Sequence, residues 1–234
     1  IDFFAGRNQL DNALKSRISF DSVIPKCADF GKIRGQQQAK RAAVISAAGG
    51  HNMLMIGPPG EGKSLIASAI PGILPSLSNH EKVELTRIYS AAGALDRDGV
   101  AVTRRPMRPV HHTVSKQALV GGGSGLPSPG EITLAHLGVL FLDELAEFST
   151  ATLETLRQPM ESGEVSISRV RASLTFPSRF TLVAAMNPCP CGYFGDSRCR
   201  CSEREVKKYQ GKISGPILDR IDLQVELKSL SVEE

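Results

Sequence analysis

A glycine-rich segment constrains this chain more than any other feature. Residues 57–64 have the sequence Gly-Pro-Pro-Gly-Glu-Gly-Lys-Ser and follow an apolar run, 51–56, that is typical of a buried strand. In this pattern the glycines turn backbone N–H groups toward phosphates, the lysine reaches the β- and γ-phosphates, and the serine can ligate Mg²⁺. The pattern therefore predicts a site for ATP and Mg²⁺ where a strand passes into a helix.

The phosphate-binding residues are expected to come from this loop and the start of the next helix. Glu61 stands where a small residue is common, and its negative charge lowers the affinity that we expect. The alternative, an ordinary glycine turn, is disfavoured by the strand before the loop and the helix after it. The predicted nucleotide-binding residues are Gly57, Pro58, Pro59, Gly60, Glu61, Gly62, Lys63, Ser64 and Leu65.

A second apolar run, 139–142, ends in the carboxylates Asp143 and Glu144. Ligands collect outside the carboxyl ends of parallel strands, so these carboxylates are expected beside the phosphate loop. Asp143 is predicted to hold Mg²⁺ together with Ser64, and Glu144 to polarise the attacking water. Alone, this pattern would more often mark a strand that ends at solvent; the phosphate loop strengthens it.

Two more side chains are candidates for the same chemistry. Asn187 follows the apolar run 180–186, and its amide can donate to a γ-phosphate while accepting from water. The alternative is an asparagine that caps a turn before proline. Arg220 is the predicted arginine finger, which in a ring would complete the site of a neighbouring subunit. Its alternative role is an ion pair with Asp219 at a helix end.

Helical and strand patterns alternate along the chain, which predicts an α/β fold with a parallel five-stranded sheet and helices on both faces. One helix is expected over 35–50, closed by glycines, and another over 63–70, stopped by Pro71. The expected strands are 52–56, 107–112, 139–142, 180–186 and 223–227.

The composition is that of a water-soluble core. The 234 residues are 41% hydrophobic, enough for one sizeable core. No apolar run approaches the roughly 20 residues of a membrane helix, and the N-terminus lacks a secretory layout, so we expect a cytoplasmic protein without a membrane partner. The net charge of +4 permits a nucleic-acid partner without arguing for one.

Together these motifs resemble the AAA+ ATPases of the magnesium-chelatase-like class, and within it the YifB/ComM subgroup. The resemblance implies a P-loop AAA+ core with a helix-2-type insertion and a pre-sensor hairpin. It also implies an ATP-driven homohexameric ring, and for the ComM branch a helicase that promotes branch migration of single-stranded or branched DNA in natural transformation. The segments that carry the resemblance are 50–64, 108–115, 119–123, 129–144, 187–192 and 214–222.

The resemblance also divides the chain. Residues 1–24 are expected to be a linker from an upstream domain, and 25–234 the nucleotide-binding core. The helical lid of the family, with its second sensor arginine, would follow Glu234.

Two segments are expected to leave the core. The gap between the phosphate loop and Asp143 is long, and its glycine-rich part predicts an insertion around 114–134 that faces the pore of the ring. Residues 163–177 alternate like a hairpin with arginines near its tip. A solvated surface hairpin is an equally good interpretation of that charge pattern. The predicted DNA-contacting residues are Lys116, Arg169 and Arg171.

Four of the five cysteines cluster as two Cys-x-Cys pairs, which could close a tetrahedral Zn²⁺ site; free thiols or disulfides are the alternatives. Cys27 is isolated and is expected to be a small apolar side chain. His111 and His112 are expected to point to opposite sides of an extended segment without a partner, and so not to ligate a metal. The predicted zinc ligands are Cys189, Cys191, Cys199 and Cys201.

Two other function classes remain open. One is a chelatase-type motor that drives a protein partner to insert a metal into a tetrapyrrole; the cysteine block fits the YifB/ComM subgroup better. The other is a scaffold that binds ATP with little turnover. The catalytic candidates are Lys63, Asp143, Glu144, Asn187 and Arg220. The intact set of Asp143, Glu144, Asn187 and Arg220 argues against the scaffold.

Overall fold

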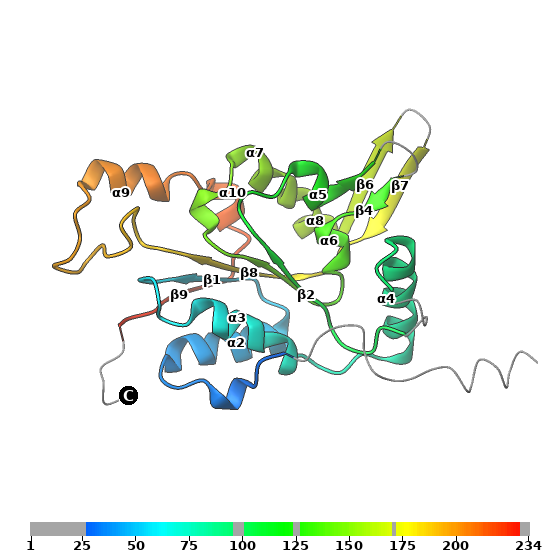
Figure 1. Cartoon of the computed structure of the whole chain (residues 1–234), viewed down its shortest axis with the longest axis horizontal. Helices are drawn as coiled ribbons and strands as arrows, with labels where there is room; N and C mark the ends of the chain where they lie inside the picture. Colours follow the sequence, from blue (N-terminus) through cyan, green and yellow to red (C-terminus); the bar gives the residue numbers. More distant parts are fainter. Residues whose placement is uncertain (1–26, 96–100, 124–126, 170–171, 230–234) are drawn as a thin grey trace, which may run out of the picture.

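The computed structural model describes residues 27–95, 101–123, 127–169 and 172–229. Its centre is a five-stranded sheet in the order β2-β5-β8-β1-β9, and all neighbouring strands in it are parallel (Figure 1). The predicted α/β fold with a parallel five-stranded sheet is confirmed. The predicted linker, 1–24, lies outside the described residues. The strands of the sheet are β1 (Met53–Ile56), β2 (Met107–Val110), β5 (Val139–Leu142), β8 (Thr181–Met186) and β9 (Leu223–Glu226).

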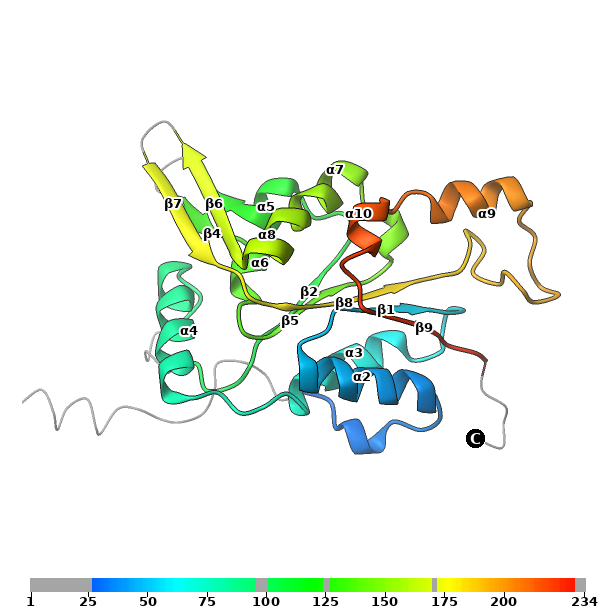
Figure 2. The same ribbon diagram turned by 180° about the vertical axis from the view of Figure 1, so that it is seen from behind.

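Helices cover both faces of the sheet. α2 and α3 lie on one face, and α5, α7, α8 and α10 lie on the other, while α4 and α9 extend at opposite ends (Figures 1 and 2). Among the described residues, no helix has both the length and the apolar character needed to cross a bilayer. The α-helices are α2 (Gln37–Gly49), α3 (Lys63–Ala69), α4 (Asn79–Ala91), α5 (Lys116–Val120), α6 (Glu131–Leu134), α7 (Thr150–Leu153), α8 (Arg157–Ser162), α9 (Glu203–Gln210) and α10 (Gly215–Leu218), and the 3₁₀ helices are η1 (Phe30–Lys32), η2 (Ile70–Gly72), η3 (Leu145–Glu147) and η4 (Glu154–Leu156).

The three inner strands, β1, β5 and β8, are almost wholly apolar because helices bury both faces of the sheet there. Successive residues of a strand point to opposite faces. Accordingly, Leu54 and Leu140 belong to the core on one face, whereas Met53 and Met55 belong to the core on the other. All four are at most 1% exposed. Burial on both sides therefore fixes the position of the short strands that carry the candidate site.

One predicted strand ends two residues earlier than expected. The strand predicted over 107–112 ends at Val110. Beyond it the chain turns, and the Val114 N–H donates to the His111 carbonyl at 3.0 Å. The two histidines, 111 and 112, therefore lie in a turn at the end of β2 and not in an extended strand.

The predicted insertion around 114–134 forms a small hairpin between α5 and α6. Its strands, β3 (Gly121–Gly122) and β4 (Ser128–Pro129), pair antiparallel. Gly121 has a φ of +108°, and a Cβ there would lie 2.5 Å from the carbonyl oxygen of Ser128. Only glycine fits such a close approach of two backbones at positive φ.

A second hairpin extends away from the sheet (Figure 1). It consists of β6 (Glu164–Arg169) and β7 (Ala172–Pro177), which pair antiparallel. Val165 and Ile167 on β6 are buried in the core beneath the hairpin. The opposite face pairs hydroxyl groups, as between Ser166 and Thr175 at 3.1 Å. The hairpin is thus anchored by one apolar face.

Asn52 ties three strands together at the amino end of β1. Its Oδ1 accepts from the Leu182 N–H of β8 at 2.8 Å. Its Nδ2 donates to the Arg220 carbonyl at 2.8 Å, and its own N–H donates to Asp222 Oδ2 at 2.9 Å. The side-chain amide therefore extends the hydrogen bonding of the sheet by one residue on both sides of β1.

Replacing Asn52 by alanine leaves the Leu182 N–H without its acceptor. We expect the free energy of unfolding to fall by about 2 kcal/mol, as measured by urea denaturation. Val83→Ala is the control, because Val83 is 52% exposed on α4, and it should change stability by less than about 0.5 kcal/mol. A loss for Asn52→Ala within the control range would show that the amide does not hold the strands.

Candidate functional site

A pocket of about 360 Å³ lies where β1, β5 and β8 end. The phosphate loop forms one wall, and the residues that follow β5 and β8 form the other. This is the arrangement that parallel strands impose, because their carboxyl ends meet at one edge. The pocket is lined by Pro59, Gly60, Glu61, Gly62, Lys63, Ser64, Leu65, Asp143, Glu144 and Asn187.

The phosphate loop depends on glycine at two positions. Gly60 and Gly62 have φ angles of +85° and +81°, in the left-handed region. A Cβ at either position would meet no atom within 4 Å, so the requirement comes from the backbone and not from space. At Gly57, by contrast, a Cβ would lie 2.7 Å from the Leu227 carbonyl oxygen. The loop therefore starts in close contact with the chain that follows β9.

Lys63 is turned inward, only 8% exposed. Its Nζ donates to the carbonyl oxygens of Gly57 at 2.5 Å and Pro58 at 2.7 Å, and to Asn187 Oδ1 at 3.2 Å. Burial lowers the pKa of Lys63, and the nearby charges of Asp143 and Glu61 oppose this shift. The ammonium group thus connects the phosphate loop with the residue that follows β8.

Ser64 and Asp143 meet across the pocket. Ser64 Oγ donates to Asp143 Oδ2 at 2.8 Å, and Asp143 Oδ1 accepts from the Glu144 N–H at 2.9 Å. A hydroxyl and a carboxylate are the hard oxygen donors that Mg²⁺ prefers. This pair therefore fits the predicted Mg²⁺ ion.

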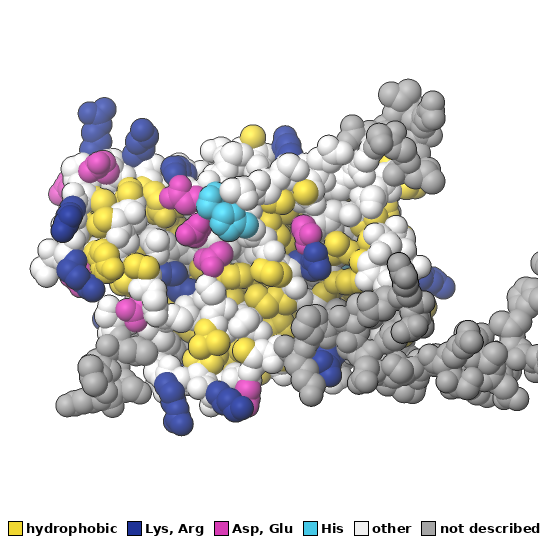
Figure 3. All heavy atoms as spheres, viewed as in Figure 1, with side chains coloured by type: hydrophobic (Ala, Val, Ile, Leu, Met, Phe, Trp, Pro, Cys, Tyr) yellow, Lys and Arg dark blue, Asp and Glu magenta, His cyan; other side chains and the backbone are white. Residues whose placement is uncertain are grey.

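Glu144 lies beside the two histidines, which corrects one prediction. Its backbone has a φ of +53°, and its Oε2 lies 3.0 Å from His112 Nδ1. The His111 and His112 rings are 4.0 Å apart, and ligand atoms of all three residues lie within 4.8 Å of one another. Figure 3 shows histidine side chains against a group of acidic ones on this face. The expectation that His111 and His112 point to opposite sides without a partner was wrong, because β2 ends at Val110 and the two histidines lie in the turn beyond it.

The strand order explains why the sequence did not reveal this contact. β2 pairs with β5, and Val110 lies opposite Leu142. The residues that follow these two strands therefore come out at the same edge. A sequence analysis could have found the contact only by placing β2 next to β5.

Arg220 lies at the opposite edge of the sheet. It precedes β9, and its carbonyl accepts from Asn52 at the amino end of β1, whereas the phosphate loop follows the carboxyl end. Its guanidinium group pairs with Glu161 and donates to the Pro216 carbonyl. The proposed alternative partner, Asp219, is not the partner seen here. Arg220 does not line the pocket of its own chain.

The predicted DNA-contacting residues lie on the insertions. Lys116 is exposed and begins α5. Arg169 is the last residue of β6. Arg171 lies outside the described residues.

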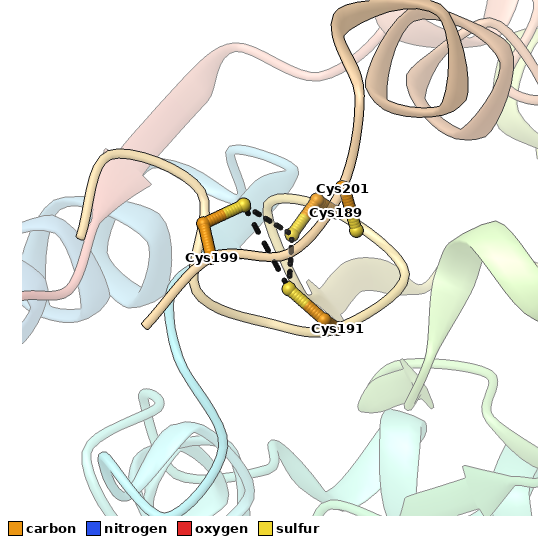
Figure 4. Close-up of side chains that lie close together, drawn as sticks. All are labelled: Cys189, Cys191, Cys199 and Cys201. Atoms are coloured by element: carbon orange, nitrogen blue, oxygen red, sulfur yellow. Dashed lines mark hydrogen bonds between the residues drawn. The ribbon is translucent and has the colours of Figure 1, made fainter. Parts of the chain in front are cut away.

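The four clustered cysteines converge on one point in the loop between β8 and α9 (Figure 4). Cys189 Sγ lies 3.4 Å from Cys191 Sγ and 4.0 Å from Cys199 Sγ. Cys191 and Cys199 are 3.8 Å apart, and all four sulfur atoms lie within 4.8 Å of one another. The backbone N–H groups of Arg200 and Tyr193 donate to Cys191 and lower the pKa of its thiol to about 6. None of the four cysteines forms a disulfide.

Cys27, the fifth cysteine, is exposed and separate from this cluster. Cys27 therefore lacks the buried environment that the expected small apolar side chain would occupy.

The strand order and the pocket define the class of the protein. A phosphate loop after β1, an Asp-Glu pair after β5 and an asparagine after β8 are arranged as in the P-loop fold of AAA+ proteins. NtrX from Brucella abortus, solved in complex with ADP, has a similar fold, with a TM-score of 0.53 and 17% identity over 86% of this chain and 38% of that one. This likeness supports the fold alone.

The chain belongs to the family of magnesium chelatase subunit ChlI, whose sequence model matches residues 29–234. It is 51% identical to YifB of Escherichia coli over 85% of this chain and 39% of that protein. It is 44% identical to the competence protein ComM of Haemophilus influenzae over 98% of this chain and 45% of that protein. The chain thus spans less than half the length of these relatives.

Replacing Lys63 by alanine should weaken ADP and ATP binding by about 10- to 100-fold. A hydrogen bond from a charged group is worth about 1.5–3 kcal/mol, and the variant loses one to the phosphates. Isothermal titration calorimetry measures the change. Lys207→Ala, at an exposed position of α9, is the control with the same change of charge. Equal affinities of the two variants would contradict the assignment.

Proposed function

We propose that this chain is the ATP-hydrolysing core of a cytoplasmic, ring-forming motor that acts on single-stranded or branched DNA. One observation carries the ATPase part of the proposal. A single pocket contains both the Ser64–Asp143 hydrogen bond of 2.8 Å and the Lys63–Asn187 hydrogen bond of 3.2 Å. These four residues come from three strand ends, and their chemistry matches that of phosphoryl transfer to water.

Each residue of the pocket has its own role in the proposed hydrolysis. Lys63 binds the β- and γ-phosphates in place of its present carbonyl partners. Ser64 and Asp143 would hold Mg²⁺, and the ion would neutralise charge on the transferred phosphoryl group. Glu144 orients the attacking water and accepts its proton, and the Asn187 amide contacts both the water and the γ-phosphate.

His112 is well placed to control Glu144. The 3.0 Å contact holds the Glu144 carboxylate toward the end of β2, beside the pocket that the carboxylate also lines. To orient a water over the γ-phosphate, Glu144 has to exchange this partner for the water. The contact with His112 therefore competes with hydrolysis.

The position of Arg220 supports a ring. The Arg220 carbonyl accepts from Asn52 at the amino end of β1, and its guanidinium group pairs with Glu161 on α8. The phosphate loop follows the carboxyl end of β1, so Arg220 lies away from the pocket of its own chain. In a head-to-tail contact, the amino ends of the strands in one copy face the carboxyl ends of the strands in the next copy. Such contacts close into a ring when the rotation between neighbouring copies permits it. In the proposed hexamer, Arg220 leaves Glu161 and stabilises the transferred phosphoryl group of its neighbour.

The two insertions support the DNA part of the proposal. The β3–β4 and β6–β7 hairpins lie on the same side of the sheet (Figures 1 and 2). Lys116 begins the helix before the first hairpin, and Arg169 ends the first strand of the second. Basic side chains on projecting elements can follow a phosphate backbone without reading its sequence. The similarity to the competence protein ComM agrees with a role in recombination during natural transformation.

A second candidate follows from the family itself. The matching family is a magnesium chelatase subunit, so the ATP cycle could drive a protein partner that inserts a metal into a tetrapyrrole. This candidate predicts ATP hydrolysis that depends on a protein and is indifferent to DNA. A scaffold with little turnover is the third, and it predicts nucleotide binding alone.

The DNA proposal is tested by ATP hydrolysis in the full-length protein, measured without DNA, with single-stranded DNA and with a branched junction. We expect DNA to raise the rate, and Glu144→Gln to abolish turnover while ATP binding persists. Lys116→Ala and Arg169→Ala should weaken DNA binding and reduce its salt dependence, because each removes one phosphate contact. Lys207→Ala is the control for charge.

The outcomes separate the three candidates. A rate that DNA leaves unchanged contradicts the DNA proposal and favours a protein partner. Turnover that survives in Glu144→Gln contradicts the assignment of the water-orienting residue.

A further inference from the structure

The cysteine loop, residues 188–201, lacks an apolar core of its own. Among these residues, all of which the structure describes, only Cys189 and Gly192 are buried. Phe194 is 52% exposed. The loop is shaped by turns, as where the Gly192 N–H donates to the Cys189 carbonyl at 3.0 Å. Segments with so little buried apolar surface are usually held by a disulfide or a metal.

The sulfur positions favour a metal over disulfides. In a tetrahedral site with Zn–S bonds of about 2.3 Å, neighbouring sulfur atoms are about 3.8 Å apart. The three measured separations among Cys189, Cys191 and Cys199 are 3.4, 3.8 and 4.0 Å. A disulfide requires about 2 Å. Cys201 completes the set of four, within 4.8 Å of the other three.

Backbone N–H groups are directed at these sulfur atoms. Those of Arg200 and Tyr193 donate to Cys191, and that of Cys201 donates to Cys199. N–H donors around sulfur stabilise thiolates and orient them toward a metal. The surroundings of the cluster therefore match those of a metal–thiolate centre.

The same loop contacts the nucleotide pocket. Gly192 has a φ of +87°, and a Cβ there would lie 2.8 Å from Pro59 Cδ, so the loop rests directly on the phosphate loop. The charge of Arg198, next to Cys199, interacts with that of Glu61. The first ligand, Cys189, follows Asn187 by two residues. A metal at this point would hold both walls of the pocket.

The loop is also joined to α9. Gln210 Nε2 donates to the Pro188 carbonyl at 3.0 Å, and Tyr209 is buried against the core. A capping box between Ser202 and Glu205 starts this helix directly after Cys201. A metal in this cluster would therefore sit between the pocket and a helix that extends beyond the end of the sheet.

We propose that Cys189, Cys191, Cys199 and Cys201 bind one structural Zn²⁺ ion, and that this ion keeps the phosphate loop and Asn187 in the positions that bind nucleotide. The first half of this inference stands on the cysteine geometry alone. The second half rests on the proposed ATP site.

Elemental analysis of the purified full-length protein tests the metal. We expect about one zinc per chain in the wild type and in Cys27→Ser, which removes the exposed cysteine outside the cluster. The double variant Cys199→Ser/Cys201→Ser should lose it; two substitutions are needed, because three thiolates and a water can still hold zinc. Cys199→His should retain the ion, since imidazole is also a zinc ligand, and this shows that loss is not caused by misfolding.

Two results would overturn the metal site. One is wild-type protein that lacks zinc and does not take up added Zn²⁺ when reduced. The other is full zinc content in the double variant.

The effect on the pocket is measured by ADP binding to the full-length protein before and after a chelator removes the zinc, and after Zn²⁺ is returned. We expect affinity to fall by about tenfold and to recover, a size typical of groups that position a site. Unchanged affinity in zinc-free protein would overturn the link to the pocket. Wild-type protein with zinc that binds no nucleotide would contradict the proposed ATPase and leave the metal site intact.

Discussion

The parallel pairing of β8 with both β1 and β5 is the constraint on which the candidate site depends. Ile56 lies opposite Met186, and Leu142 opposite Ala184. The phosphate loop, the Asp-Glu pair and Asn187 therefore leave the sheet at nearly the same level, and short hydrogen bonds can close between them. The helices on both faces stabilise this arrangement, because they bury strands that are too short to hold their positions alone.

The other edge of the sheet has a different character. There Asn52 joins β1 to β8 and to the chain before β9, and Arg220 is held by Glu161. The sheet thus separates the groups that surround the pocket from the arginine that is proposed to act on it. Assembly could therefore complete the site, since a second copy can supply the arginine that lies away from the pocket in the first.

Much of this could be predicted from the sequence, for local reasons. The phosphate loop and the apolar runs that end in polar residues are contiguous patterns, and they located β1, β5 and β8. The meeting of Ser64 with Asp143 was predicted from the strand ends, but other contacts between distant segments were not. The meeting of His112 with Glu144 depends on the order of strands in the sheet, and the choice of Glu161 over Asp219 as partner of Arg220 depends on how α8 packs.

The cysteine loop shows the same limit. The two pairs of cysteines stand close together in the sequence, so one metal ion bound by all four could be suggested. The contact of Gly192 with Pro59 joins segments that are far apart along the chain, and only the fold brings them together. The proposed effect of the metal on the pocket could therefore be inferred only from the structure.

Mixing two inactive subunits tests the central claim, that the ATP site is completed by Arg220 of a neighbouring copy. Full-length Lys63→Ala and Arg220→Ala proteins are each expected to lack ATP hydrolysis. In mixed rings, a subunit with intact Lys63 can face a neighbour with intact Arg220, so we predict that mixing restores part of the activity. If both variants are inactive alone and stay inactive in mixed rings, Arg220 does not act across the interface, and the account is contradicted.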